Sequence, residues 1–224
     1  MKTKDNNLSG PYHLLADLFV YPGINYHEEV KLVQTFLGMN FKEAAEILSP
    51  FTNFVEKASL HTLEELFTRS FEVQAVTTLD LGYLLFGDDY KRAELLVNLN
   101  REHNEVNNDC GHELPDHLPN VLRLLPKLND NELRNELVNL IVAPAMMKIL
   151  DDFRPEKLQA KNKVYMKHHK TLIEQPANYA LIYHIPVKVV MYFISNDFDI
   201  QVVDQSRQAS GFLGALDQEM ELEK

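Results

Sequence analysis

The chain has 224 residues, of which 45% are hydrophobic and 25% charged, and its formal net charge is −11. This size suits one domain with a buried core. The negative charge argues against nucleic acid as a partner, because attraction to phosphates supplies most nonspecific affinity. The single cysteine, Cys110, cannot form an internal disulfide, and we recognise no signal segment, so we expect a cytoplasmic protein.

Helical periodicity recurs along the chain, whereas alternating strand patterns are scarce. The sequence therefore predicts an all-α fold, a single-domain helical bundle. The first helix carries an apolar face over residues 14–19 and ends at Tyr21-Pro22-Gly23, because proline lacks an N–H donor and glycine allows the chain to turn. A second apolar face follows over residues 30–37.

Four further helix starts are predicted from capping signals. Asn40, Thr62 and Asn129 each precede a glutamate by three residues, as in a capping box. Ser49-Pro50 has a proline suited to the first helical position. Later in the chain, Pro144 predicts a kink or a new helix, since proline costs about 3 kcal/mol in a helix interior.

The carboxyl-terminal part contains the most apolar window, residues 177–194, which includes His184 and Lys188. A charge near the middle of a membrane span costs about 2.5 to 3.5 kcal/mol, so we interpret this window as a core or interface segment and expect no stable membrane insertion. We assign a helical domain to residues 1–204 and a flexible, acidic tail to residues 205–224. The chain is expected to be a monomer or a dimer.

The segment ELPDHLP, residues 113–119, is one candidate site. Asp116 stands where the N-cap of the following helix is expected, and its carboxylate would then accept the Leu118 N–H. Alternatively, Asp116 and His117 form a pair at a rigid corner and offer hydrogen-bonding groups to a bound peptide. The residues alone leave a structural cap and a peptide site both open.

The segment GYLLFGDDYKR, residues 82–92, is the second candidate site. Gly87-Asp88-Asp89 predicts a helix break and restart. Tyr83 and Phe86 fit the core, where aromatic residues on helical faces usually pack. Alternatively, they line a groove that accepts the apolar face of a client helix.

Motifs for catalysis or metal binding are missing from the sequence. His112-Glu113 lacks the second histidine of HExxH, His168-His169 are adjacent and cannot share a helical face, and Cys110 has no cysteine partner at ligand spacing. Phosphate-binding glycine loops are also missing. We therefore expect a protein without catalytic residues, cofactor or metal, with a metal-dependent hydrolase and a generic helical interaction domain as alternatives.

Residues 82–92 and 113–119, in this order, resemble the nitrate reductase delta subunit family of molybdenum-enzyme assembly chaperones, often called NarJ, within the TorD-like superfamily. The resemblance extends over residues 63–125 and, more loosely, to LLADLFVYPG at residues 14–23. It implies a helical, nonenzymatic chaperone that binds the N-terminal peptide of the catalytic subunit of a molybdopterin oxidoreductase. Such a chaperone holds the apo-enzyme until molybdopterin and iron–sulfur cofactors are inserted.

The resemblance also implies a set of peptide-binding residues. Three aromatic residues would lie beside the groove and three polar residues would contact the peptide. These six are Tyr83, Phe86 and Tyr90, and Glu113, Asp116 and His117. The sequence after Ile149 departs from the family pattern, and it leaves open which molybdenum enzyme is the client.

Overall fold

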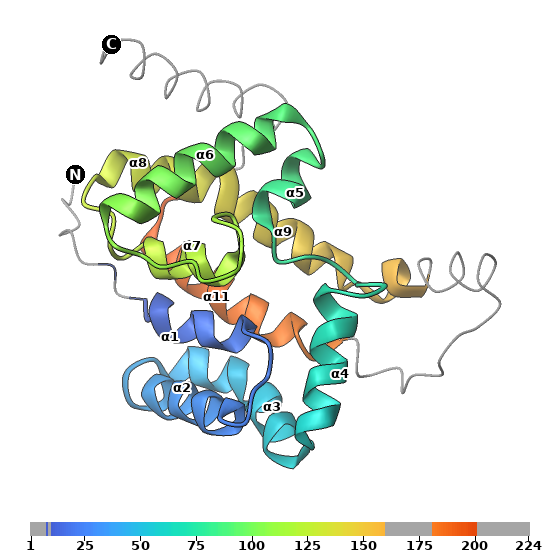
Figure 1. Cartoon of the computed structure of the whole chain (residues 1–224). Helices are drawn as coiled ribbons and strands as arrows, with labels where there is room; N and C mark the ends of the chain where they lie inside the picture. The colour runs from blue at the N-terminus through green and yellow to red at the C-terminus, as the bar shows by residue number, and fades with distance from the viewer. Residues whose placement is uncertain (1–7, 9, 160–180, 201–224) are drawn as a thin grey trace, which may run out of the picture. The chain divides into compact units, whose positions relative to one another are not determined.

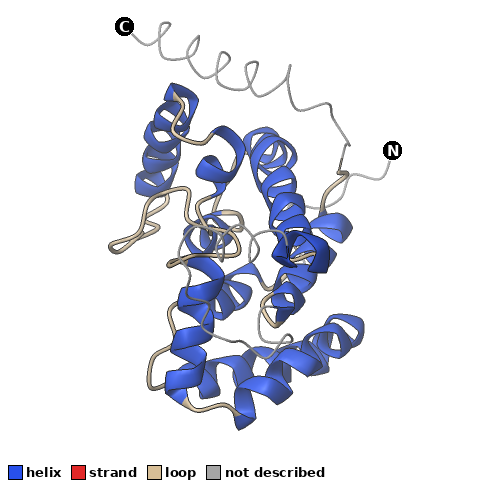
Figure 2. Ribbon diagram, turned by 90° about the vertical axis from the view of Figure 1, so that its right-hand side faces the viewer, coloured by secondary structure: helices blue, strands red, loops and turns tan. Residues whose placement is uncertain are grey.

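The computed structural model describes residues 8, 10–159 and 181–200. Within these residues the regular secondary structure is helical and no strand is present (Figure 2), so the predicted all-α fold is confirmed. In chain order, the helices in Figure 1 are α1 (Tyr12–Ala16), the 3-10 helix η1 (Asp17–Phe19), α2 (Tyr26–Asn40), α3 (Lys42–Lys57), α4 (Leu60–Phe71), α5 (Leu81–Phe86), α6 (Tyr90–Glu105), α7 (Leu118–Leu124), α8 (Asn131–Leu137), the π-helix η2 (Val138–Val142), α9 (Ala143–Asp152) and α11 (His184–Asp197).

The described residues belong to two compact units. The first unit takes residues up to 16, residues 80–146 and residues from 191 onward. The second unit takes residues 17–79 and 147–190. Helices α9 and α11 therefore contribute to both. The acidic tail predicted over residues 205–224 lies outside the described residues.

In the first unit, α1 packs against α7 and α5 packs against α6. The apolar face predicted near the start of the chain is buried at Leu15, and the α7 face is buried at Val121 and Leu122. The start of α1 is tied down by Asp197, whose Oδ2 accepts the Tyr12 hydroxyl at 2.8 Å and the Gly10 N–H at 3.0 Å. Apolar packing and one half-buried carboxylate thus fix this helix.

In the second unit, α2 packs against α3 and buries Val30, Val33 and Leu37, as the sequence predicts. Aromatic side chains from α3, α4, the residue directly after α9 and the segment before α11 contact one another. We call this set the aromatic core: Phe51, Phe67, Phe71, Phe153 and Tyr183.

Several helix starts lie elsewhere than predicted. Asn40 ends α2, and its side chain donates to the Phe36 carbonyl instead of capping α3. The cap of α4 is Ser59, whose hydroxyl accepts the Thr62 N–H, so the capping signal at Thr62 is three residues too late. The cap of α8 is Asp130, one residue after the predicted Asn129.

The two prolines that were expected to mark helix starts or kinks have different places in the structure. Pro50 was expected to start a helix but lies inside α3, where it is exposed. Pro144 is the second residue of α9, and α9 directly follows the π-helix η2. The sequence predicted a kink or a new helix at Pro144, and the structure has a new helix, α9, that begins one residue before it, after a single wider turn of π-helix.

The apolar window at residues 177–194 is described from residue 181 onward and forms much of α11. Val187, Val190 and Ile194 of this helix are fully buried. In the described part of the chain, no helix combines the length and the apolar character that crossing a membrane requires.

Candidate functional site

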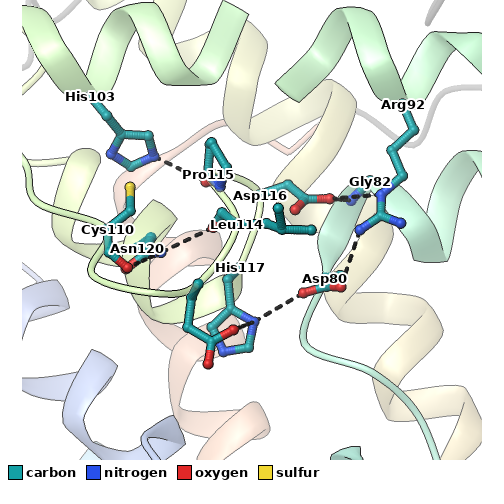
Figure 3. Close-up of polar contacts among 11 residues, drawn as sticks. Asp80, Gly82, Arg92, His103, Cys110, Leu114, Pro115, Asp116, His117 and Asn120 are labelled. Atoms are coloured by element: carbon teal, nitrogen blue, oxygen red, sulfur yellow. Dashed lines mark hydrogen bonds and ion pairs between the residues drawn. The ribbon is translucent and has the colours of Figure 1, made fainter. Parts of the chain in front are cut away.

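The two segments singled out in the sequence meet in the first unit (Figure 3). Asp80 and His117 form an isolated antiparallel bridge, and the Leu81 N–H donates to the Asp116 carbonyl at 3.0 Å. This pairing joins the start of α5 to the segment before α7. Residues 82–92 and 113–119 therefore form one local structure, although 20 or more residues separate them in the sequence.

Asp116 caps α5, not the helix that follows it. Its Oδ2 accepts the N–H of Gly82, in the first turn of α5, at 3.1 Å, and its side chain is fully buried. Helix α7 begins at Leu118 after His117, which makes no side-chain capping bond. The prediction that Asp116 accepts the Leu118 N–H is therefore wrong, because a residue 34 positions away supplies the donor.

Gly82 is required by this close approach. A Cβ atom at position 82 would lie 2.7 Å from Asp116 Oδ2 and 3.0 Å from Leu95 Cδ2. The first distance is shorter than carbon and oxygen tolerate, and both neighbours are held by packing. The absence of a side chain at Gly82 thus lets a carboxylate reach the helix backbone.

The arrangement around Asp116 is completed by Arg92, Asp80 and His117. The Arg92 guanidinium donates through Nε to Asp116 Oδ2 at 3.3 Å and through Nη2 to Asp80 Oδ2 at 3.1 Å. His117 Nδ1 lies 3.0 Å from Asp80 Oδ1. We call Asp80, Arg92, Asp116 and His117 the charged clasp. Arg92 belongs to one motif segment and Asp116 and His117 to the other, so the clasp links the two segments by side chains. Asp80 lies just before the first segment.

The two carboxyl groups of the clasp have opposite electrostatic environments. The hydrogen bond from His117 lowers the pKa of Asp80, and Arg92 acts in the same direction. Burial raises the pKa of Asp116, and the charge of Asp80 adds to this effect, whereas Arg92 opposes it. Asp116 Oδ1 is buried and has no hydrogen-bond partner among the described residues. Asp80 is accordingly the stable anion of the pair, and Asp116 is the group closer to taking up a proton.

A buried polar network orders the loop that precedes the clasp. The Asn108 amide lies 2.8 Å from His103 Nδ1, and His103 Nε2 lies 3.0 Å from the Pro115 carbonyl. Since an amide N–H donates to Nδ1, Nε2 carries the ring proton and donates to Pro115. Burial lowers the pKa of His103, which keeps the ring neutral. This neutral tautomer satisfies both neighbours.

Asn120, near the start of α7, closes the same loop from the other side. Its amide nitrogen donates to the carbonyls of Leu114 at 3.0 Å and Cys110 at 3.3 Å, as Figure 3 shows. Lys127 donates to the Asn108 side-chain oxygen at 2.8 Å. The corner that carries Asp116 and His117 is thus held by directional polar contacts.

The aromatic candidates differ in their surroundings. Tyr83 is 45% exposed and Tyr90 is 67% exposed, whereas Phe86 is half-buried. The Arg92 guanidinium lies 5.2 Å from the centre of the Tyr83 ring, within the range of a cation–π contact. Tyr83 therefore extends from the clasp to the surface.

Glu113 and Leu114 are exposed on the neighbouring segment. Glu113 Oε2 lies 3.9 Å from His117 Nδ1, farther than a hydrogen bond. The six predicted site residues thus divide into the buried Asp116, the half-buried Phe86 and His117, and the exposed Tyr83, Tyr90 and Glu113.

Other features of the first unit are separate from these residues. An apolar hollow is lined by Leu95, Leu99, Leu128, Leu133 and Leu137, with Asn98 and Glu102, and none of the six predicted residues lines it.

Cys110 lies in the polar loop predicted for it, and burial and the charge of Asp109 raise the pKa of its thiol. Its thiolate is therefore disfavoured, which makes it a poor nucleophile. The described part of the chain contains no group of three or more His, Cys, Asp or Glu side chains placed to hold a metal ion. His168 and His169 lie outside the described residues.

Sequence reasoning missed Asp80 and gave Arg92 no role. Asp80 precedes the first residue of α5, which is a signal for a helix cap, yet its side chain makes no capping bond. Comparison of the chain with protein-family models finds no match, and comparison with curated proteins finds none either.

Proposed function

We propose that this protein is an assembly chaperone that binds the N-terminal segment of the catalytic subunit of a molybdopterin oxidoreductase, such as nitrate reductase. It holds the apo-subunit while the molybdenum cofactor is inserted and then releases it. The proposal rests on the resemblance of residues 82–92 and 113–119 to this chaperone family. The observation that carries it is the direct contact between these two segments through the hydrogen bonds from Gly82 and Arg92 to Asp116.

The exposed side chains around the clasp suit a peptide partner. Tyr83 and Tyr90 offer aromatic surface, and Leu114 adds apolar area on the adjoining segment. Glu113 contributes an exposed carboxylate. Aromatic anchors with a polar rim are the usual basis of peptide affinity. A modest set of exposed anchors also fits a partner that must be released.

Asp116 and His117 have different tasks in this proposal. Asp116 is fully buried, so it supports the site from within by capping α5. His117 is half-buried and bonded to Asp80 through one ring nitrogen, so it retains a second nitrogen for a partner. Replacing Asp116 is therefore expected to lower stability, whereas replacing surface residues tests binding directly.

A pull-down with the tagged full-length chain tests the proposal. Cells are grown with and without molybdate, and captured proteins are identified by mass spectrometry. Enrichment of a molybdopterin oxidoreductase catalytic subunit, greatest when molybdate is scarce, supports the chaperone. Failure to capture that subunit while it is expressed refutes it, and capture of unrelated proteins favours a generic interaction domain.

Matched surface variants locate the binding site. The test variant combines Tyr83→Ala, Tyr90→Ala and Glu113→Gln. The control variant combines exposed residues of α2, with Leu32→Ala, Met39→Ala and Glu28→Gln, and so removes similar apolar area and the same charge. Loss of capture by the first variant alone supports the site around the clasp. Equal capture of the catalytic subunit by both variants would show that the binding site lies elsewhere.

A hydrolase predicts a different result. Elemental analysis of protein purified without chelator would then find a stoichiometric metal, and turnover of a generic substrate would accompany it. The chaperone proposal predicts neither a stoichiometric metal nor turnover of a substrate.

A further inference from the structure

The contacts of His117 are unequal at its two ring nitrogens. Nδ1 lies 3.0 Å from Asp80 Oδ1 and 3.9 Å from Glu113 Oε2. Within the described residues, no hydrogen bond or ion pair is made by Nε2. The side chain is 16% exposed, and Nε2 is not among the buried polar atoms without a partner in the described residues, so this nitrogen is open to a partner.

The chemistry of Asp80 decides where the ring proton resides. Asp80 also accepts from Arg92 at 3.1 Å, and a carboxylate that serves two donors is an acceptor only. A short contact between a carboxylate and an imidazole nitrogen requires that nitrogen to carry the hydrogen. In neutral His117 the proton is therefore on Nδ1, and Nε2 has a lone pair.

We propose that Asp80 is a positioning residue that fixes His117 as a hydrogen-bond acceptor at Nε2, and that this atom receives an N–H donor of the client segment. The donor is a backbone amide, a guanidinium or an ammonium group, since each presents N–H and no lone pair. This inference rests on the proposed function for the client, but its first half concerns the protein alone. Arg92 assists from the other side by holding Asp80 in place.

The tautomer is measured without any ligand. Long-range hydrogen–nitrogen NMR spectra of nitrogen-labelled protein distinguish protonated from unprotonated imidazole nitrogens, and His117→Gln assigns the signals. The measurement is made at a pH of about 8, above the usual histidine pKa of about 6.5. We expect His117 to show a protonated Nδ1 and an unprotonated Nε2. A proton on Nε2 overturns the inference.

The role of Asp80 is tested with a matched pair of variants. Asp80→Asn offers an amide that donates to Nδ1, which frees the ring to place its proton on Nε2. Glu113→Gln makes the same chemical change near the same nitrogen but removes no hydrogen bond. We expect Asp80→Asn to shift the tautomer and Glu113→Gln to leave it unchanged. An unchanged tautomer in Asp80→Asn overturns the positioning role.

Binding is then measured by calorimetry with a synthetic peptide that copies the N-terminal segment of the captured catalytic subunit. Loss of one hydrogen bond at a partly buried site predicts that Asp80→Asn weakens binding roughly tenfold. In a His117→Gln background, the Asp80→Asn change should cost no further affinity, because the residue that it positions is gone. An equal loss in both backgrounds shows a merely structural role and overturns the inference.

The outcomes separate the two proposals. A wild-type protein that binds no such peptide refutes the proposed function and the acceptor role together, while the spectra alone decide the tautomer. Peptide binding that is unaffected by a demonstrated tautomer shift refutes the acceptor role and leaves the chaperone standing. If Asp80→Asn does not fold, the wild-type spectrum still decides which ring nitrogen carries the proton, and a proton on Nε2 overturns the inference. The His117→Gln affinity decides whether the ring contributes to binding.

Discussion

The aromatic core of the second unit and the charged clasp of the first unit are built from opposite kinds of contact. In the core, Tyr183 meets Phe71 with ring centres 4.8 Å apart and Phe51 at 5.5 Å. In the clasp, Arg92 and Gly82 donate to particular carboxylate oxygens. Rings packed edge to face gain mainly from buried area, whereas a hydrogen bond needs one donor aimed at one acceptor. The core should therefore respond to lost volume and the clasp to small changes of shape or charge.

The largest expected effect comes from removing a ring of the core. Phe67→Ala should lower the free energy of unfolding by about 3–5 kcal/mol, because it leaves a cavity where Phe71 and Tyr183 pack. Urea unfolding followed by circular dichroism measures the change. Tyr21→Ala is the control, since Tyr21 also touches Phe67 at 5.5 Å but is 47% exposed. An equal loss in both variants would contradict the importance of burial.

An added methyl group should damage the clasp. Gly82→Ala is expected to cost about 1–3 kcal/mol of stability through overpacking against Asp116. In α2, Gly38 has no atom within 4 Å of the Cβ position, so Gly38→Ala should instead stabilise the protein by about 0.5–1 kcal/mol. Thermal unfolding of both variants should show changes in stability of opposite sign. A Gly82→Ala variant of unchanged stability would show that the Asp116 side chain can move away at little cost.

A smaller effect tests the corrected helix start. Ser59→Ala removes the hydroxyl that accepts the Thr62 N–H and should cost about 1 kcal/mol. Ser49, whose sequence context also suggested a start, lies within α3, so Ser49→Ala should change stability by less than about 0.5 kcal/mol. Chemical denaturation of the pair distinguishes a cap from an interior serine.

The most localised effect is a pH dependence of the loop before the clasp. Burial lowers the pKa of His103 below its usual 6.5, so the unfolded chain takes up this proton first as the pH falls. The contribution of neutral His103 to folding stability is therefore full above pH 6.5. It is lost as the pH falls from 6.5 toward the lowered pKa of His103 in the folded state. The hydrogen-exchange protection of residues 106–117, relative to the rates of unstructured peptide at each pH, should decrease as the pH falls across this range.

His184 provides the internal comparison for that experiment. Burial also lowers the pKa of His184, which begins α11 in the second unit. Global stability therefore reports both histidines, whereas local exchange separates them. His103→Gln should reduce the pH response of the 106–117 loop and leave that of α11 unchanged. An unaltered loop response would show that another group controls it.

Local sequence signals were sufficient to predict a helix boundary or a core position where the interacting residues are near one another in the chain. The break at Gly87 and the restart of α6 follow prediction, with Gly87 at a φ of 62° and Asp89 accepting the Lys91 N–H. The core positions of α2 and α7 follow from their periodicity in the same way. In each case the energetic preference belongs to a few consecutive residues.

The charged clasp could not be predicted from the sequence, because it is stabilised by contacts between residues that are far apart in the chain. Asp116 looks like the cap of the next helix, since a capping pattern has no information on a donor 34 residues earlier. Asp80 and Arg92 look like ordinary surface charges until the chain brings them together. Pattern reading identified both motif segments, but only their contact reveals which residues work together.

Gly82 and Asp116 also form a complementary pair in volume. A side chain at one position occupies the space that the carboxylate of the other requires, with 2.7 Å between the atoms concerned. Their substitutions should therefore be energetically coupled, and a smaller residue at position 116 should relieve part of the cost of alanine at position 82. Among sequences descended from a common ancestor, such coupling appears as paired change. The two positions would then vary together or not at all.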